Sequence, residues 1–259
     1  TQKDYPHVYY NDLKPRVFDA KIFYNSAGTP LDADHPNGWG TVMAVGMRLG
    51  GGKVRADMDK TDGNTYNPNV DRTMRSAIVL FDVTNPEKAP KVIGEIALEG
   101  QGYTTCYPAV LPMRSKSGSG SGATYATNDW YLVFGSGPAN AAGEPATGSP
   151  LTEVISQQTG KMFIVDLRAM VQSGEVRAVN NTGTMTTLAG NLSGTATPWY
   201  FDQYEANTYI SQPLVLDYNL DFNADVAYFG TVSGSRLLGW GGNVRRLIFD
   251  ERKTGTSAA

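Results

Sequence analysis

The nine residues from Asp217 to Asp225, with the sequence DYNLDFNAD, carry an oxygen-bearing side chain at every second position. Oxygen ligands at positions 1, 3, 5, 7 and 9 of a tight loop can bind Ca²⁺, with position 7 normally using its backbone carbonyl. Three carboxylates that converge on one point also repel each other unless a cation lies between them. The spacing therefore predicts a calcium site formed by Asp217, Asn219, Asp221, Asn223 and Asp225.

This loop departs at two positions from the calcium-binding loop found between helices. Position 6 is Phe222 instead of glycine, and position 12 is Tyr228 instead of a bidentate glutamate. We therefore expect Asp225 to supply the closing ligand, and Asn223 to use its carbonyl. The alternative is a polar hairpin loop in which the Asp and Asn side chains serve turn geometry.

A second acidic stretch, VRADMDKTDGNTYN, is a weaker candidate for metal binding. Its oxygen-bearing side chains belong to Asp57, Asp59, Asp62 and Asn64. Their spacing breaks the regular alternation that a calcium loop needs. The sequence thus favours a solvated loop here, with a second calcium site as the alternative.

The flanks of the Asp217–Asp225 loop indicate how it is held. Apolar runs precede it (Pro213–Leu216) and follow it (Val226–Phe229), which is typical of two strands joined by a loop. The whole chain of 259 residues is 41% hydrophobic and 18% charged, with 29 glycines, and this fits short strands joined by many turns. A net charge of −3 gives no reason to expect nucleic acid as a partner, and no apolar run reaches the ~18 residues of a membrane span.

One strand order recurs three times along the chain. Pro15, Pro108 and Pro213 mark the start of the three copies, and such recurrence indicates a repeat architecture. The predicted repeat units are residues 13–100, 105–180 and 211–251, with 1–12 as a connector and 181–210 as a long loop.

The repeat predicts an all-β fold. About four antiparallel strands repeated in tandem are typical of β-propeller blades, here with long loop insertions. Three units are fewer than the ~4–8 blades that close a ring, so we expect the chain to form an incomplete propeller. A β-sandwich is the competing fold. Helix is expected only as a turn or two at Leu167–Ser173, where the residues have good helix propensity.

Motifs for catalysis are weak. The two histidines, His7 and His35, have no His or Glu partner at metal-ligand spacing. The glycine run before Lys53 does not form a phosphate-binding loop motif. The position of the motif's first glycine is Met47, and the position of its final Ser or Thr is Val54. The single cysteine, Cys106, forms no internal disulfide and is expected to be buried. The sequence thus predicts a protein that is not an enzyme.

Four stretches together resemble the C-terminal β-propeller of the PilY1/PilC family of type IV pilus biogenesis factors and tip adhesins. They are a glycine-terminated strand containing W-G-T-V, the turn IVLFDVTNP, the spaced acidic loop, and the strand GGNVRRLIFD. Most of the chain is covered in the family's order, and the acidic loop is the most specific part. In sequence order the stretches are Gly38–Gly52, Ile78–Pro86, Asp217–Asp225 and Gly241–Asp250.

The resemblance implies a calcium-binding protein at the cell surface, at a pilus tip or the outer membrane. Its partners would be minor pilins or other pilus-tip proteins, and a host or abiotic surface. Its roles would be in pilus assembly, the balance of extension and retraction, twitching motility and attachment. Two alternatives stay open, a quinoprotein-like dehydrogenase propeller and a lectin-like or structural propeller.

Overall fold

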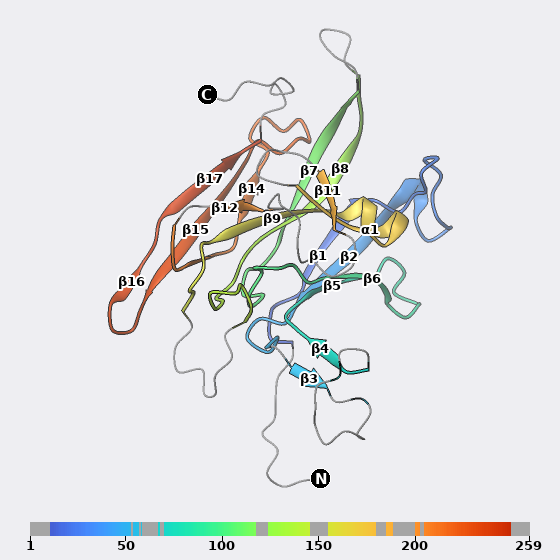
Figure 1. Cartoon of the computed structure of the whole chain (residues 1–259). Helices are drawn as coiled ribbons and strands as arrows, with labels where there is room; N and C mark the ends of the chain where they lie inside the picture. Colours follow the sequence, from blue (N-terminus) through green and yellow to red (C-terminus); the bar gives the residue numbers. More distant parts are fainter. Residues whose placement is uncertain are drawn as a thin grey trace.

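In the computed structural model, nearly all of the regular secondary structure is antiparallel β-sheet (Figure 1). In this part there are three larger sheets, one two-stranded sheet, one α-helix and one short 3-10 helix. The all-β fold predicted from the strand and turn pattern is confirmed. The described residues are 11–52, 54–56, 58, 67, 70–117, 124–145, 155–179, 185–188, 200–202 and 205–249.

The first sheet is a four-stranded meander whose own strands pair in the order in which they occur along the chain. Its strands are β1 (Arg16–Lys21), β2 (Trp39–Gly46), β5 (Ile78–Asp82) and β6 (Lys91–Ile96). The 3-10 helix η1 (Pro36–Gly38) leads into β2. Between β2 and β5 the chain forms a separate two-stranded sheet, β3 (Val54–Ala56) with β4 (Arg72–Met74).

The second sheet repeats this order and extends it. Its strands run β11-β10-β9-β8-β7, and β12 also pairs with β9. Strands β7 and β8 form a long hairpin that projects beyond the neighbouring strands (Figure 1). The bounds are β7 (Ala109–Ser117), β8 (Thr124–Gly135), β9 (Lys161–Asp166), β10 (Val176–Val179), β11 (Met185–Leu188) and β12 (Phe201–Asp202).

The third sheet is built around one long strand, β15 (Val226–Ser235). One half of β15 pairs with β14 and β17, and the other half with β13 and β16. The remaining bounds are β13 (Thr208–Ile210), β14 (Leu214–Leu216), β16 (Gly239–Gly241) and β17 (Val244–Ile248).

The second sheet is buried on both faces because it lies between the other two. Leu132 and Phe134 on β8 join an apolar cluster with the first sheet, while Val133 between them joins a cluster with the third sheet. On β9, Phe163 joins the cluster with the first sheet and Ile164 joins the cluster with the third sheet. Successive side chains of a strand point to opposite faces, so a strand covered on both faces reads as a continuous apolar run. The two separate clusters show three stacked layers, whereas a sandwich has two.

The predicted helical turns are confirmed as α1 (Leu167–Ser173). Asp166 caps the helix, because its carboxylate accepts the backbone N–H groups of Arg168 and Ala169 at 2.9 and 3.1 Å. The helix ends at Gly174, whose φ of 68° closes the last turn in the left-handed region. Leu167 joins the apolar cluster between the first and second sheets.

The structure also bears on the predictions for Cys106 and for the segment 181–210. Cys106 is buried, as predicted. The segment 181–210, expected to be a long loop, contributes three short strands, β11, β12 and β13. β11 pairs with β10, β12 with β9, and β13 with β15, so each short strand is held by a strand of the second or third sheet. The exact boundaries of the repeat units stay a prediction.

Candidate calcium-binding loop

The acidic loop connects two paired strands, as the sequence predicted. Leu216, the last residue of β14, pairs with Val226, the first residue of β15. The backbone N–H of Asp225 donates to the carbonyl of Leu216 at 2.9 Å, which closes the base of the loop. The five candidate ligands therefore lie in a single hairpin connection between antiparallel strands.

The first carboxylate is directed into the loop. One oxygen of Asp217, Oδ1, accepts the N–H of Asp221 at 3.2 Å, and the other, Oδ2, accepts the N–H of Phe222 at 2.8 Å. Asn219 also accepts the N–H of Asp221, at 3.1 Å. These bonds bring positions 1 and 3 of the loop against the backbone of positions 5 and 6.

The other two carboxylates also accept backbone N–H groups. Asp221 Oδ1 accepts from Asn223 at 3.0 Å, and Asp225 Oδ2 accepts from Tyr218 at 2.9 Å. Each bond uses one lone pair of a carboxylate oxygen that has two, so both carboxylates keep further acceptor capacity. This pattern fits the turn-forming role of Asp and Asn, and it also leaves oxygens that can bind a cation.

Two apolar residues in the loop adopt backbone conformations that side chains usually avoid. Leu220 and Phe222 have φ angles of 60° and 63°, in the left-handed region. Tyr218, Leu220 and Phe222 are all more than 70% exposed. The loop thus directs apolar side chains outward and oxygen-bearing side chains toward its own backbone.

The loop is docked on β7 of the neighbouring sheet. Asn223 is buried, and its Oδ1 accepts the backbone N–H of Arg114 at 3.0 Å. The N–H of Ala224 donates to the carbonyl of Pro112 at 2.9 Å. The guanidinium of Arg114 also donates to the carbonyl of Asp221 and lies 3.9 Å from its carboxylate. Because the Asn223 side chain is engaged with β7, its backbone carbonyl is the better placed group for a metal, in line with the spacing rule.

The structure does not gather the three carboxylates into a ready metal site. In the described part of the chain, no three His, Cys, Asp or Glu side chains stand close enough together to hold a metal ion. The chemistry of the donor set nevertheless fits Ca²⁺, because carboxylate, carboxamide and carbonyl oxygens are the hard ligands it prefers. Asp57, Asp59, Asp62 and Asn64 of the second acidic stretch lie outside the described residues.

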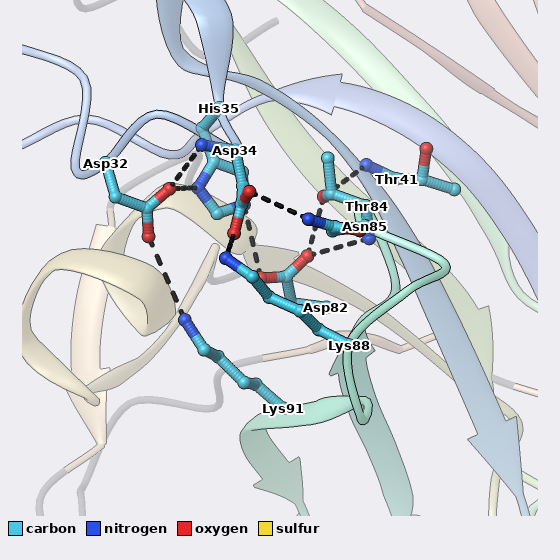
Figure 2. Close-up of polar contacts among 9 residues, drawn as sticks. All are labelled: Asp32, Asp34, His35, Thr41, Asp82, Thr84, Asn85, Lys88 and Lys91. Carbon is cyan, nitrogen blue, oxygen red and sulfur yellow. Dashed lines mark hydrogen bonds and ion pairs between the residues drawn. The ribbon is translucent and has the colours of Figure 1, made fainter.

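A second group of charged residues comes together where the sequence showed no motif (Figure 2). His35 is buried, with Asp32 at 2.7 Å from Nδ1 and Asp82 at 3.2 Å from Nε2. Next to these three residues, the ammonium group of Lys88 donates to the carboxylate of Asp34. Asp82 is 47 residues from His35, so the sequence could not show that the two are in contact. The only local indication of a charged cluster was the presence of Asp32 and Asp34 just before His35.

Together the fold and the loop define an all-β, propeller-like protein of stacked antiparallel sheets with an acidic loop in one hairpin. No protein-family model and no curated protein matches the sequence. Among solved structures, the chain is similar to the C-terminal domain of PilY1 from Pseudomonas aeruginosa, with 19% sequence identity and a TM-score of 0.43. The likeness covers 92% of this chain and 30% of that one. Within its described residues, the chain has no helix long and apolar enough to cross a membrane.

Proposed function

We propose that this chain is a non-enzymatic, calcium-binding, propeller-like domain of a protein associated with the type IV pilus tip. The observation that carries the proposal is the Asp217–Asp225 loop, with alternating oxygen ligands in a hairpin connection between β14 and β15. The loop's resemblance to that of pilus biogenesis factors and tip adhesins supports the assignment to pili. The protein would then act at the cell surface, with minor pilins or other pilus-tip proteins as partners.

In this proposal Ca²⁺ supplies the positive charge that lets the loop carboxylates converge. Asp217, Asn219, Asp221 and Asp225 contribute side-chain oxygens, and Asn223 contributes its carbonyl. The loop is already closed by its own hydrogen bonds and docked on β7, so little of the backbone has to be ordered on binding. Binding free energy would then stabilise this hairpin relative to its open forms.

The role would be in pilus assembly, in the balance of extension and retraction, and in attachment. A hairpin that changes stability with calcium can change how the adjoining surface contacts a partner, because a ligand shifts a protein toward the state that binds it better. Tyr218, Leu220 and Phe222 are exposed on that surface. Twitching motility and surface attachment would depend on calcium for this reason.

Calcium titration by calorimetry tests the metal site. The wild-type chain should bind one Ca²⁺ with a dissociation constant between about 10⁻⁷ and 10⁻³ M, the range from sensor to extracellular sites. Asp221→Ala should weaken binding at least about tenfold, because it removes a charged ligand. Asp19→Ala is the matched control, since Asp19 lies on β1 and bonds to Thr41. Equal affinity in both variants would show that the ion binds elsewhere.

A separate experiment tests the pilus role. The full-length protein with either substitution is expressed in the bacterium that makes it, and surface pili and twitching zones are measured. Asp221→Ala should change both measurements while Asp19→Ala leaves them as in the wild type. Normal pili and twitching in a variant that has lost calcium would overturn the proposed role while leaving the metal site in place.

A further inference from the structure

His35 lies in the connection between β1 and β2, where its ring is enclosed. The side chain is 3% exposed, and the ring stacks on Phe23 with centroids 4.0 Å apart and planes at 10°. Asp32, on the same connection, approaches one ring nitrogen, and Asp82, at the end of β5, approaches the other (Figure 2). The ring therefore joins the β1–β2 connection to the first sheet.

Both ring nitrogens face carboxylate oxygens at hydrogen-bond distance, 2.7 and 3.2 Å. A neutral imidazole has one N–H and one lone pair, whereas the charged imidazolium has two N–H groups. An ionised carboxylate only accepts hydrogen bonds, so a neutral ring can satisfy one of these two partners and opposes the other. The geometry fits the charged ring and does not fit the neutral one.

Asp82 is held ionised, so Nε2 of the ring faces a negative charge. Burial acts to raise the pKa of Asp82, but the hydroxyl and backbone N–H of Thr84, together with His35, outweigh it and leave the pKa below its usual value. Thr84 donates to Asp82 from its N–H at 3.0 Å and from its hydroxyl at 2.6 Å. Asp82 thus has donors on both sides.

We propose that His35 is a pH-sensitive clamp, which in its charged form fixes the β1–β2 connection to β5 through two carboxylates and which loosens that connection when the proton is lost. Loss of the proton removes one of the two bridges and leaves a lone pair facing a carboxylate. The connection carries Tyr24, whose backbone carbonyl accepts from Gln172 of α1 at 2.7 Å and whose hydroxyl accepts from Arg168. A looser connection would therefore also weaken the contact with α1.

Other charged groups face the clamp from each packed element. On the connection they are Asp32 and Asp34; at the end of β5 and in the turn after it they are Asp82 and Lys88; on β6 it is Lys91. The hydrogen bond to Lys88 lowers the pKa of Asp34, and the same bond raises the pKa of Lys88. That ion pair, together with the hydrogen bond from Asn85 to Asp34, ties the connection to the turn after β5 independently of His35.

Nuclear magnetic resonance of the wild-type chain tests the clamp without a substitution in it. The chain has two histidines, so a His7→Gln variant assigns the ring signals of His35. Between pH 5 and 9, loss of the ring proton should coincide with faster amide exchange at Phe23, Leu31 and Gly38, whose N–H groups bond within the connection. After correction for intrinsic pH dependence, the increase should be at least about tenfold, as for one lost charged hydrogen bond. A neutral ring at acid pH, or protection unchanged by titration, would overturn the proposal.

A matched pair of variants separates the clamp from general charge effects. Asp32→Asn keeps an oxygen acceptor beside Nδ1 but removes its charge, so loss of protection should begin at lower pH than in the wild type. Asp12→Asn makes the same chemical change at a carboxylate that pairs with Arg48, beyond the opposite end of β2, and should behave as the wild type. The same shift in both variants would exclude a specific clamp.

Discussion

The backbone N–H of Arg114 on β7 donates to Oδ1 of Asn223 at 3.0 Å, across 109 residues of sequence. This bond crosses from the second sheet to the acidic loop of the third. Asn223 is buried, so the bond is shielded from water. The acidic loop is thus part of the packing between two sheets as well as the connection of one hairpin.

Asn223→Ala should lower the free energy of unfolding by about 1–3 kcal/mol in the presence of a calcium chelator, because the substitution leaves a backbone N–H without its acceptor. Chemical denaturation measures the change. Asn219→Ala is the control in the same loop. The Asp221 N–H that Asn219 accepts also bonds to Asp217, so this variant should lose less than about 0.5 kcal/mol. Equal losses would contradict a specific role for docking on β7.

Gly135→Ala should be destabilising by about 1–3 kcal/mol or more, because a new methyl group overpacks the contact between the second and third sheets. A Cβ at Gly135 would lie 2.1 Å from the Cβ of Ile210, which is fully buried. Thermal unfolding measures the effect. Gly52→Ala is the control, since its Cβ would have nothing nearer than the Tyr103 hydroxyl at 3.9 Å. A stable Gly135→Ala variant would show that the sheets can separate at this contact.

Asp166→Ala should cost about 1 kcal/mol of unfolding free energy, the usual value of a lost helix N-cap. The variant leaves the N–H groups of Arg168 and Ala169 without their side-chain acceptor. Asp166→Asn keeps an oxygen at the same position and should cost less. Urea denaturation followed by circular dichroism compares the two variants, and an equal cost would mean that capping is not what Asp166 contributes.

The Cys106 thiol should make folding sensitive to alkaline pH. Burial raises its pKa to about 12, although the N–H of Gly135 donates to the sulfur and acts in the opposite direction. An unfolded cysteine ionises near pH 8.5, so from about pH 8.5 up to 12 the unfolded state loses a proton that the folded state retains.

Over that pH range stability should fall by up to about 1.4 kcal/mol per pH unit through this group. Denaturation of the wild type and of Cys106→Ala at pH 7, 9 and 10 measures it. Cys106→Ala should show a shallower decline, whatever its stability at pH 7. The native thiol should also resist a disulfide reagent until denaturant is added. Rapid labelling of the folded protein would contradict its burial.

Several elements could be predicted from local sequence because their signals are local. The loop between Pro213–Leu216 and Val226–Phe229 was expected from two apolar runs and the polar residues between them, and the structure has β14 and β15 there. The helix at Leu167–Ser173 was expected from propensity, and the structure adds its cap. The short strands β11, β12 and β13 were missed, because edge strands form by pairing with a sheet that the local sequence does not reveal.

For the candidate site, too, some features follow from local sequence and others only from the tertiary structure. The amino-acid sequence alone determined which oxygens are available in the Asp217–Asp225 loop, since ligand type and spacing are properties of a continuous segment. Only the tertiary structure decided that Asn223 faces Arg114. It also placed Asp82 at His35, a contact between residues 47 positions apart. Contacts across such distances depend on how sheets stack, and stacking is set by the summed burial of many apolar side chains, which no short motif records.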